Sequence, residues 1–265
     1  ISTSARVLRY TFKLDCIYME QHKAYVNAFP MGINYSLYRD TAGKPEVKQY
    51  IKEIRRGYGK NNKLVLSVDR LDYSKGILHR IKAFERFIRE HPEFNEKVSL
   101  VMIIVPSRDA VSRYAKLKKK IDELIGAING TYSSINWTPI YYFYHSFPFN
   151  ELIAMYSMAD IALVTPLRDG MNLVAKEYVA VKGDNPGVLI LSEMAGSAVE
   201  LGQGAILINP NDIQQISEAL VQALLMPENE KLDRLRKMQK VISRQTVKKW
   251  ANDFVNELID VQNKN

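Results

Sequence analysis

The feature that most constrains the fold is an alternation of short apolar runs with amphipathic stretches over the last two hundred or so residues. Six apolar runs have the length of strands: 63–68, 98–105, 140–144, 161–165, 187–191 and 205–209. Stretches with helical periodicity separate or follow them, at about 76–90, 109–128, 149–159, 171–182 and from 211 onward. Because the runs are apolar at successive positions, both strand faces must be covered. The pattern predicts an α/β fold, a Rossmann-like doubly wound parallel sheet.

The first 40 residues contain too little periodic structure for a domain. Residues 27–34 predict a strand with a Pro-Met-Gly turn, and 45–56 predict a helix with one apolar face. We therefore interpret 1–40 as the end of a preceding domain plus a connector, and 41–265 as the Rossmann-like domain. The chain begins with Ile1 and not Met, so we expect a fragment or a processed product.

Composition excludes several classes of protein. A chain that is 46% hydrophobic and 25% charged is typical of folded proteins. A single cysteine, Cys16, excludes a disulfide framework or a Cys-based zinc cluster within the chain. No apolar run approaches the roughly 20 residues of a membrane span, and no signal segment opens the chain, so a cytoplasmic protein without membrane contact is expected.

The net charge of +8 suggests a polyanionic partner without identifying it. The densest basic cluster is Lys116 with Lys118–Lys120, and apolar residues at helical spacing run through the same stretch. These lysines are therefore interpreted as the solvated face of a surface helix. Nucleic-acid binding is kept only as an alternative, and the expectation is no nucleic acid.

Ligands of doubly wound sheets bind beyond the carboxyl ends of the strands, where the strand order reverses. With the order 3-2-1-4-5-6 this point lies between the first and fourth strands, so the loops after residues 68 and 165 are the ones to inspect. In the first loop, Arg70 can fork onto two phosphate oxygens and Lys75 can add a point charge. The alternative is that both cations pair with Asp69 and Asp72 in their own loop.

The second loop leads into a helix, whose N-terminal amides favour phosphate. Gly170 would let the backbone approach a ligand closely, whereas Asp169 could simply cap the helix. Glu177, two turns into the helix, is either a surface glutamate or an acceptor for ribose hydroxyls.

Two further loops end at the same edge of the predicted sheet. Arg108 could bind a second anion or pair with Asp109, and Phe147 could line a flat ring or simply pack. His145 belongs to no metal-ligand spacing, and the chain has no P-loop, nucleophile elbow or His-Glu zinc motif.

Two segments carry a family resemblance: VDRLDYSKG at 68–76 and TPLRDGMNLVAKEY at 165–178. They resemble the trehalose-6-phosphate synthases, which are retaining glycosyltransferases with two Rossmann-like domains facing across a cleft, the GT-B architecture. Supporting stretches are 28–34, 105–108, 129–147 and 185–198, and the similarity covers about 27–255. The resemblance implies that the chain is the C-terminal, donor-binding half, with 1–40 a remnant of the acceptor-side domain.

The family transfers glucose from UDP-glucose to glucose 6-phosphate, with retention, giving trehalose 6-phosphate and UDP. By resemblance the catalytic residues are Arg70 and Lys75, on the donor diphosphate, and Asp169, on a hydroxyl of the transferred glucose. Arg108 matches the arginine that reaches the acceptor phosphate. Further donor-binding residues implied are Phe147 at the uracil pocket, Gly170, Met171, Asn172, Leu173, Val174, Ala175, Lys176 and Glu177, the last on the ribose.

The resemblance implies no cofactor and no metal, because cations and helix amides stabilise the leaving diphosphate. Family members carry a catalytic histidine in an N-terminal domain that this chain lacks. We therefore expect donor binding without turnover by this chain alone, and a last helix, 246–260, that packs on the missing domain. Left open are the donor nucleotide, a homo-oligomer, a fusion to a phosphatase domain after Asn265, and a sugar-nucleotide sensor without catalysis.

Overall fold

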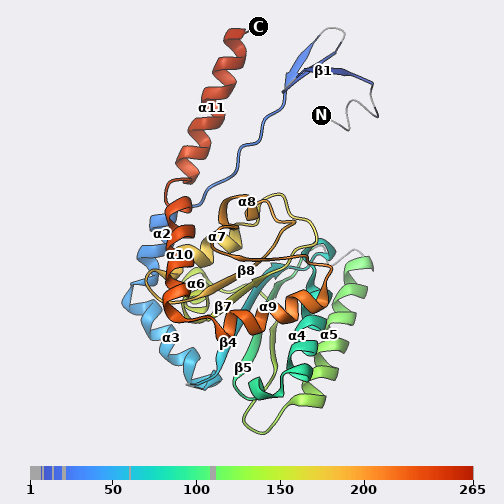
Figure 1. Cartoon of the computed structure of the whole chain (residues 1–265), viewed down its shortest axis with the longest axis vertical. Helices are drawn as coiled ribbons and strands as arrows, with labels where there is room; N and C mark the ends of the chain where they lie inside the picture. The colour runs from blue at the N-terminus through green and yellow to red at the C-terminus, as the bar shows by residue number, and fades with distance from the viewer. Residues whose placement is uncertain are drawn as a thin grey trace. The chain divides into compact units, whose positions relative to one another are not determined.

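Figure 1 shows the computed structural model, which describes residues 7, 9–13, 15–19, 22–59, 61–107 and 112–264. The described chain divides into two compact units. One comprises Ile33–Arg244, and the other is built from the segments Ile1–Gly32 and Gln245–Asn265. The assignment of 1–40 and 41–265 to the two domains of a longer protein is a different division, and it stays a prediction.

Among the described residues, six parallel strands form the central sheet of the larger unit, in the order β6-β5-β4-β7-β8-β9. Along the chain they are β4 (Lys63–Arg70), β5 (Val98–Val105), β6 (Ile140–Phe143), β7 (Ile161–Val164), β8 (Val188–Ser192) and β9 (Ile206–Ile208). In sequence numbering this order is 3-2-1-4-5-6. The predicted α/β, doubly wound fold is therefore confirmed, together with the position of its switch point.

Helices cover both faces of the sheet (Figure 1). One face packs against α4 (Ile77–Glu90), α5 (Ser112–Tyr132) and α9 (Ile213–Leu225). The other packs against α2 (Tyr35–Ala42), α3 (Pro45–Tyr58), α6 (Phe149–Met158), α7 (Leu173–Lys182), α8 (Ala198–Leu201) and α10 (Glu228–Ile242). Short 3₁₀ turns, η1 (Tyr73–Lys75) and η2 (Pro92–Phe94), flank α4. Val65 faces the first layer, whereas Leu64 and Leu66 face the second, which is why these strands are apolar at successive positions.

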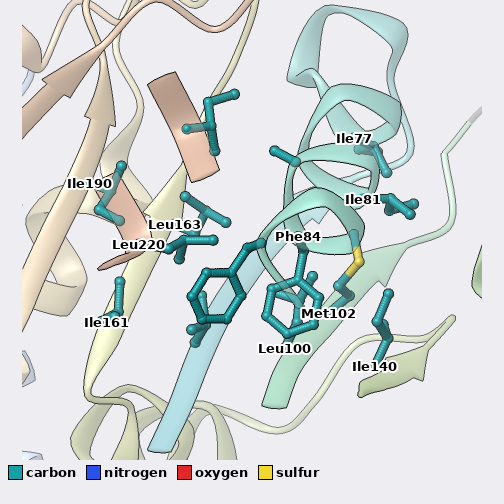
Figure 2. Close-up of a cluster of buried hydrophobic side chains, with 14 of the residues drawn as sticks. Ile77, Ile81, Phe84, Leu100, Met102, Ile140, Ile161, Leu163, Ile190 and Leu220 are labelled. Carbon is teal, nitrogen blue, oxygen red and sulfur yellow. The ribbon is translucent and has the colours of Figure 1, made fainter. Parts of the chain in front are cut away.

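The core beneath α4 illustrates how the periodicity becomes packing. Ile77, Ile81 and Phe84 recur at helical spacing, and all three are buried. Figure 2 shows them above the strands that carry Leu100 and Leu163. Burying a side chain of this size stabilises the fold by about 1.5–3 kcal/mol, so α4 is fixed on the sheet by its apolar face.

Residues 27–34, predicted as a strand, form no continuous strand, and this prediction is wrong. Pro30 has no N–H to donate to a ladder. At Gly32 a Cβ atom would overlap the carbonyl oxygen of Gln245, so the segment passes close against another stretch of backbone in the same unit and does not pair with a strand.

In the smaller unit, β1 (Thr11–Lys13), β2 (Cys16–Tyr18) and β3 (Lys23–Tyr25) form an antiparallel meander. The unit also contains α11 (Val247–Lys264), where the Trp250 indole donates to the carbonyl of Phe29 at 3.1 Å. Whether this last helix packs on a further domain stays a prediction. No helix in the described part of the chain is long and apolar enough to span a membrane.

Candidate functional site

A cavity of about 280 Å³ lies at the switch point, beyond the carboxyl ends of the paired strands β4 and β7. Its lining comes from the two loops that the sequence singled out. The lining residues are Val68, Asp69, Arg70, Lys75, Asp169, Met171, Asn172, Leu173 and Val174. The fold therefore brings together seven residues that the sequence analysis proposed as donor-binding.

Lys75 and Asp169 form an ion pair across this cavity, with 2.6 Å between the ammonium nitrogen and a carboxylate oxygen. Both side chains are largely buried, at 15% and 14% exposed. Burial acts to raise the pKa of Asp169, but Lys75, the Met171 N–H and the Asn172 amide outweigh it and hold that pKa below its ordinary value. Lys75 thus forms its ion pair with the opposite loop and not with an acid of its own.

The loop before α4 is shaped by Asp72 and Gly76. The Asp72 carboxylate accepts from the Ser74 N–H at 2.8 Å, which starts the 3₁₀ turn that carries Lys75. Gly76 has φ +68°, and a Cβ atom there would overlap the carbonyl oxygen of Thr165. Only glycine therefore permits the two loops to approach this closely.

Arg70, the last residue of β4, is exposed and lines the cavity. Its guanidinium has no hydrogen-bonding or ion-pairing partner within the part of the chain that the structure describes. Asp69, the neighbour proposed as its alternative partner, pairs instead with Arg80 at 2.7 Å. The Arg70 guanidinium is thus available for an anion in the cavity.

The start of α7 differs from the prediction by two residues. Asn172, with φ +66°, is the N-cap, and its side chain accepts from the Ala175 N–H at 3.1 Å. Asp169 is consequently not the helix cap. The first N–H groups of a helix have no intrahelical partner, so those of Leu173 and Val174 are left at the cavity wall with the positive end of the helix dipole.

The loop at 169–171 is braced by the segment after β8, a contribution that sequence reasoning missed. The Gly196 N–H donates to the Asp169 carbonyl at 2.9 Å, and the Ser197 N–H donates to the Met171 carbonyl at 2.8 Å. A Cβ atom at Gly196 would overlap the carbonyl oxygen of Gly170, whereas one at Gly170 would meet nothing within 4 Å. A side chain at position 170 would therefore fit without a clash. At position 196 only glycine allows the segment after β8 to lie this close to the 169–171 loop.

Glu177 lies on α7, one turn after Leu173 and Val174, and is not among the residues that line the cavity. Its two carboxylate oxygens accept from the hydroxyls of Tyr38 and Tyr156, each at 2.9 Å. Burial, then the charge of Glu177, raises the pKa of both tyrosines. Sequence reasoning missed these tyrosines because no local spacing relates them to Glu177, and the ribose role of Glu177 stays a prediction.

Several other predicted donor residues do not line the cavity. Lys176 is buried and ion-paired with Glu200 in α8, and Ala175 is buried in the core. Phe147 packs against Phe143 and His145, with ring centroids 5.3 and 4.5 Å away. The predicted acceptor residue Arg108 lies outside the described residues. The roles proposed for these side chains stay predictions.

In the residues that the structure describes, no three His, Cys, Asp or Glu side chains gather to hold a metal ion. What the cavity offers is cationic and backbone-donor chemistry. A guanidinium, an ammonium and a helix N-terminus line the cavity together with Asp69, which is paired with Arg80, and Asp169. This arrangement is suited to a phosphorylated ligand that also carries hydroxyl groups.

Comparisons with known proteins agree with this geometry. The model of glycosyltransferase family 20 matches residues 1–260. The bifunctional trehalose-6-phosphate synthase/phosphatase of Thermoproteus tenax is 44% identical over 257 residues, which are 97% of this chain and 35% of that protein.

Two solved structures are similar in fold and sequence. The UDP-forming alpha,alpha-trehalose-phosphate synthase of Burkholderia xenovorans in complex with glucose-6-phosphate matches with a TM-score of 0.88 and 37% identity, over 92% of this chain and 54% of that one. The E. coli protein bound with UDP-2-fluoro glucose matches with a TM-score of 0.87 and 35% identity, over 94% and 55%. The chain thus spans between a third and somewhat more than half of these relatives.

Proposed function

The chain belongs to glycosyltransferase family 20, and we propose that it forms the donor-binding half of a UDP-forming alpha,alpha-trehalose-phosphate synthase. The observation that carries this proposal is the cavity at the switch point, where Arg70, Lys75 and the N-terminus of α7 face one another. The complexes of two relatives with glucose-6-phosphate and UDP-2-fluoro glucose support the choice of substrates.

In this proposal, Arg70 and Lys75 bind the diphosphate of UDP-glucose. The bond between glucose C1 and the β-phosphate oxygen breaks, and its electron pair stays on the phosphate. The two cations and the amides of Leu173 and Val174 stabilise that growing charge in a site formed before the reaction starts. Asp169, held ionised by Lys75, accepts from a hydroxyl of the transferred glucose.

The acceptor hydroxyl of glucose 6-phosphate then attacks the same face of C1, which gives retention of configuration. Its proton passes to the leaving phosphate oxygen, so the step needs no carboxylate pair and no metal. The products are trehalose 6-phosphate and UDP. Because the chain spans only part of its relatives' length, we propose that it binds the donor and does not complete turnover alone.

Titration calorimetry tests the donor site. UDP, GDP and ADP are titrated into the chain, beside Arg70→Ala and the control Arg89→Ala, which removes an exposed α4 arginine that pairs with Glu90. We expect binding of UDP that Arg70→Ala weakens at least tenfold and Arg89→Ala leaves unchanged. The assignment is contradicted if the wild-type chain binds all three nucleotides equally well. It is also contradicted if Arg70→Ala binds UDP as tightly as the wild type.

Several finer features stay predictions that this experiment does not address. They are the cytoplasmic location, a homo-oligomer and a fusion to a phosphatase domain. The Thermoproteus tenax relative is such a synthase/phosphatase by name, which makes the fusion the first of these to examine.

A further inference from the structure

Arg80, on α4, is a fully buried cation beneath the switch point, with 0% of its surface exposed. Its guanidinium donates through Nε to the Thr165 hydroxyl at 3.0 Å and through Nη1 to the Asp69 carboxylate at 2.7 Å. Nη1 also contacts the Ser67 hydroxyl, and Nη2 donates to the Lys75 carbonyl at 3.1 Å. One planar group therefore joins β4, the end of β7 and the turn that carries Lys75.

Packing alone does not explain an arginine at this position. Ile77, Ile81 and Phe84 already bind α4 to the sheet, and burying a charge costs free energy that an apolar side chain of similar volume avoids. What the arginine adds is geometry, because its donors are held in one rigid plane and reach several fixed acceptors at once.

The acceptors are the backbone and side chains that carry the cavity wall. Asp69 and Lys75 line the cavity themselves, and Thr165 begins the loop that leads to Asp169. The same two loops meet at Gly76, where there is no room for a Cβ atom. A shift of either loop would therefore separate Lys75 from Asp169.

We infer that Arg80 is a positioning residue that holds the Lys75 loop and the Asp169 loop at the separation the anion site requires. It does not touch the ligand, and it acts through Lys75 and Asp169. The part of this inference that names a nucleoside diphosphate as the ligand rests on the proposed function. The geometric part concerns this chain alone and can be measured without any ligand.

The first test compares Arg80→Lys with a matched control. Lysine keeps a positive charge beside Asp69 but cannot reach Thr165 and the Lys75 carbonyl at the same time. The control is Lys182→Met, which removes another buried cation at the opposite edge of the sheet, where Lys182 donates to the carbonyls of Ser157 and Ala159. Calorimetry with UDP is expected to show at least a tenfold loss of affinity for Arg80→Lys and none for Lys182→Met.

The second readout is the titration of the Asp169 carboxylate, followed by carbon NMR without ligand. In Arg80→Lys we expect its pKa to rise toward the ordinary aspartate value, because Lys75 is no longer held beside it. If the wild-type chain binds no UDP but this shift occurs, the proposed function fails and the positioning role stands. A folded Arg80→Lys chain with wild-type UDP affinity and wild-type Asp169 titration overturns the inference.

Thr165→Val keeps the test decisive if Arg80→Lys does not fold. It conserves the shape of a buried side chain and removes one acceptor of the Arg80 fork. Both readouts are expected to move in the same direction, with roughly a threefold loss of UDP affinity. A folded Thr165→Val chain that changes neither readout refutes the positioning role.

Discussion

The ammonium of Lys75 lies 2.6 Å from the carboxylate of Asp169, although 94 positions separate the two residues in the sequence. Lys75 follows β4 and Asp169 follows β7, and these strands are neighbours only because the strand order reverses between them. The ion pair is therefore a product of topology, and it places one cation and one anion in the same cavity.

Lys75→Met is expected to raise the pKa of Asp169. Burial raises that pKa, and Lys75 is the main group that lowers it, so without Lys75 the effect of burial is less opposed. In the wild type the pKa of Asp169 is lower in the folded than in the unfolded chain. The pair therefore stabilises the fold at pH values above the unfolded pKa of Asp169, and this contribution is lost as the pH falls through its folded pKa. Urea unfolding at pH 7 and pH 3 should show the wild-type advantage over Lys75→Met shrinking at the lower pH.

The exposed pair of Lys237 with Asp233, at 55% and 62% exposure, provides the control. Lys237→Met should change the free energy of unfolding by less than about 1 kcal/mol at either pH, because water screens an exposed pair. An equal acid sensitivity in the two variants would count against a special role for the Lys75–Asp169 pair.

Gly76→Ala should destabilise the chain far more than Gly59→Ala. Both glycines have positive φ, at +68° and +84°, and alanine is strained at either position, by about 1–3 kcal/mol. Gly76 is left-handed, whereas Gly59, with ψ 146°, lies in a region that is even less open to alanine, so the backbone cost is no smaller at Gly59. A Cβ atom at Gly59 meets nothing within 4 Å, whereas one at Gly76 overlaps the Thr165 carbonyl. Thermal unfolding of the two variants isolates the clash, and equal melting temperatures would mean that the loops can separate freely.

The strands and the two central loops could be predicted because they depend on local signals, and the sheet order because it is the common order of doubly wound folds. Strands buried on both faces are apolar throughout, and a Gly-containing loop before an apolar helix marks a phosphate-binding turn. Arg80 could not be recognised in this way. A single arginine among apolar helical positions has the same pattern as a surface residue, and its four acceptors come from segments up to 85 positions distant.

The start of α7 was predicted two residues too early for a local reason. Asp169 and Asn172 are both good capping residues, and the hydrogen bond from the Ala175 N–H to the Asn172 side chain decides between them. The meander at 11–25 was missed because strands of three residues are too short to show an alternation.

Tyr156→Phe should destabilise the chain by about 2 kcal/mol, since it removes the hydrogen bond from the hydroxyl of a buried tyrosine to a carboxylate. Tyr38→Phe removes the matching bond to Glu177 from a half-buried position, so a loss of about 1 kcal/mol is expected. Urea unfolding measures both. In the variant Glu177→Gln each tyrosine substitution should cost less, and an unchanged cost would show that the two hydroxyls do not act through Glu177.

The pH dependence of stability should carry the signature of Lys182. Burial, reinforced by Arg55 and Lys63 and opposed by Asp160, lowers the pKa of Lys182 to about 8. The unfolded chain holds the same proton up to its ordinary pKa near 10.4. Between these values the unfolded state binds more protons, so the free energy of unfolding rises with pH, by about 1.4 kcal/mol per pH unit at most.

The comparison with Lys182→Met isolates this effect. The tyrosines with raised pKa lower the free energy of unfolding above about pH 10. They do so in both chains, so their contribution cancels in the difference. Relative to Lys182→Met, the wild type should gain about 2 kcal/mol between pH 7 and pH 10. The neutral Lys182 amine still has two N–H groups, one for each of the carbonyls of Ser157 and Ala159, so both hydrogen bonds remain after deprotonation. The free-energy cost of the buried charge is then removed. Parallel stability curves for the two chains would mean that native Lys182 keeps its proton throughout this range.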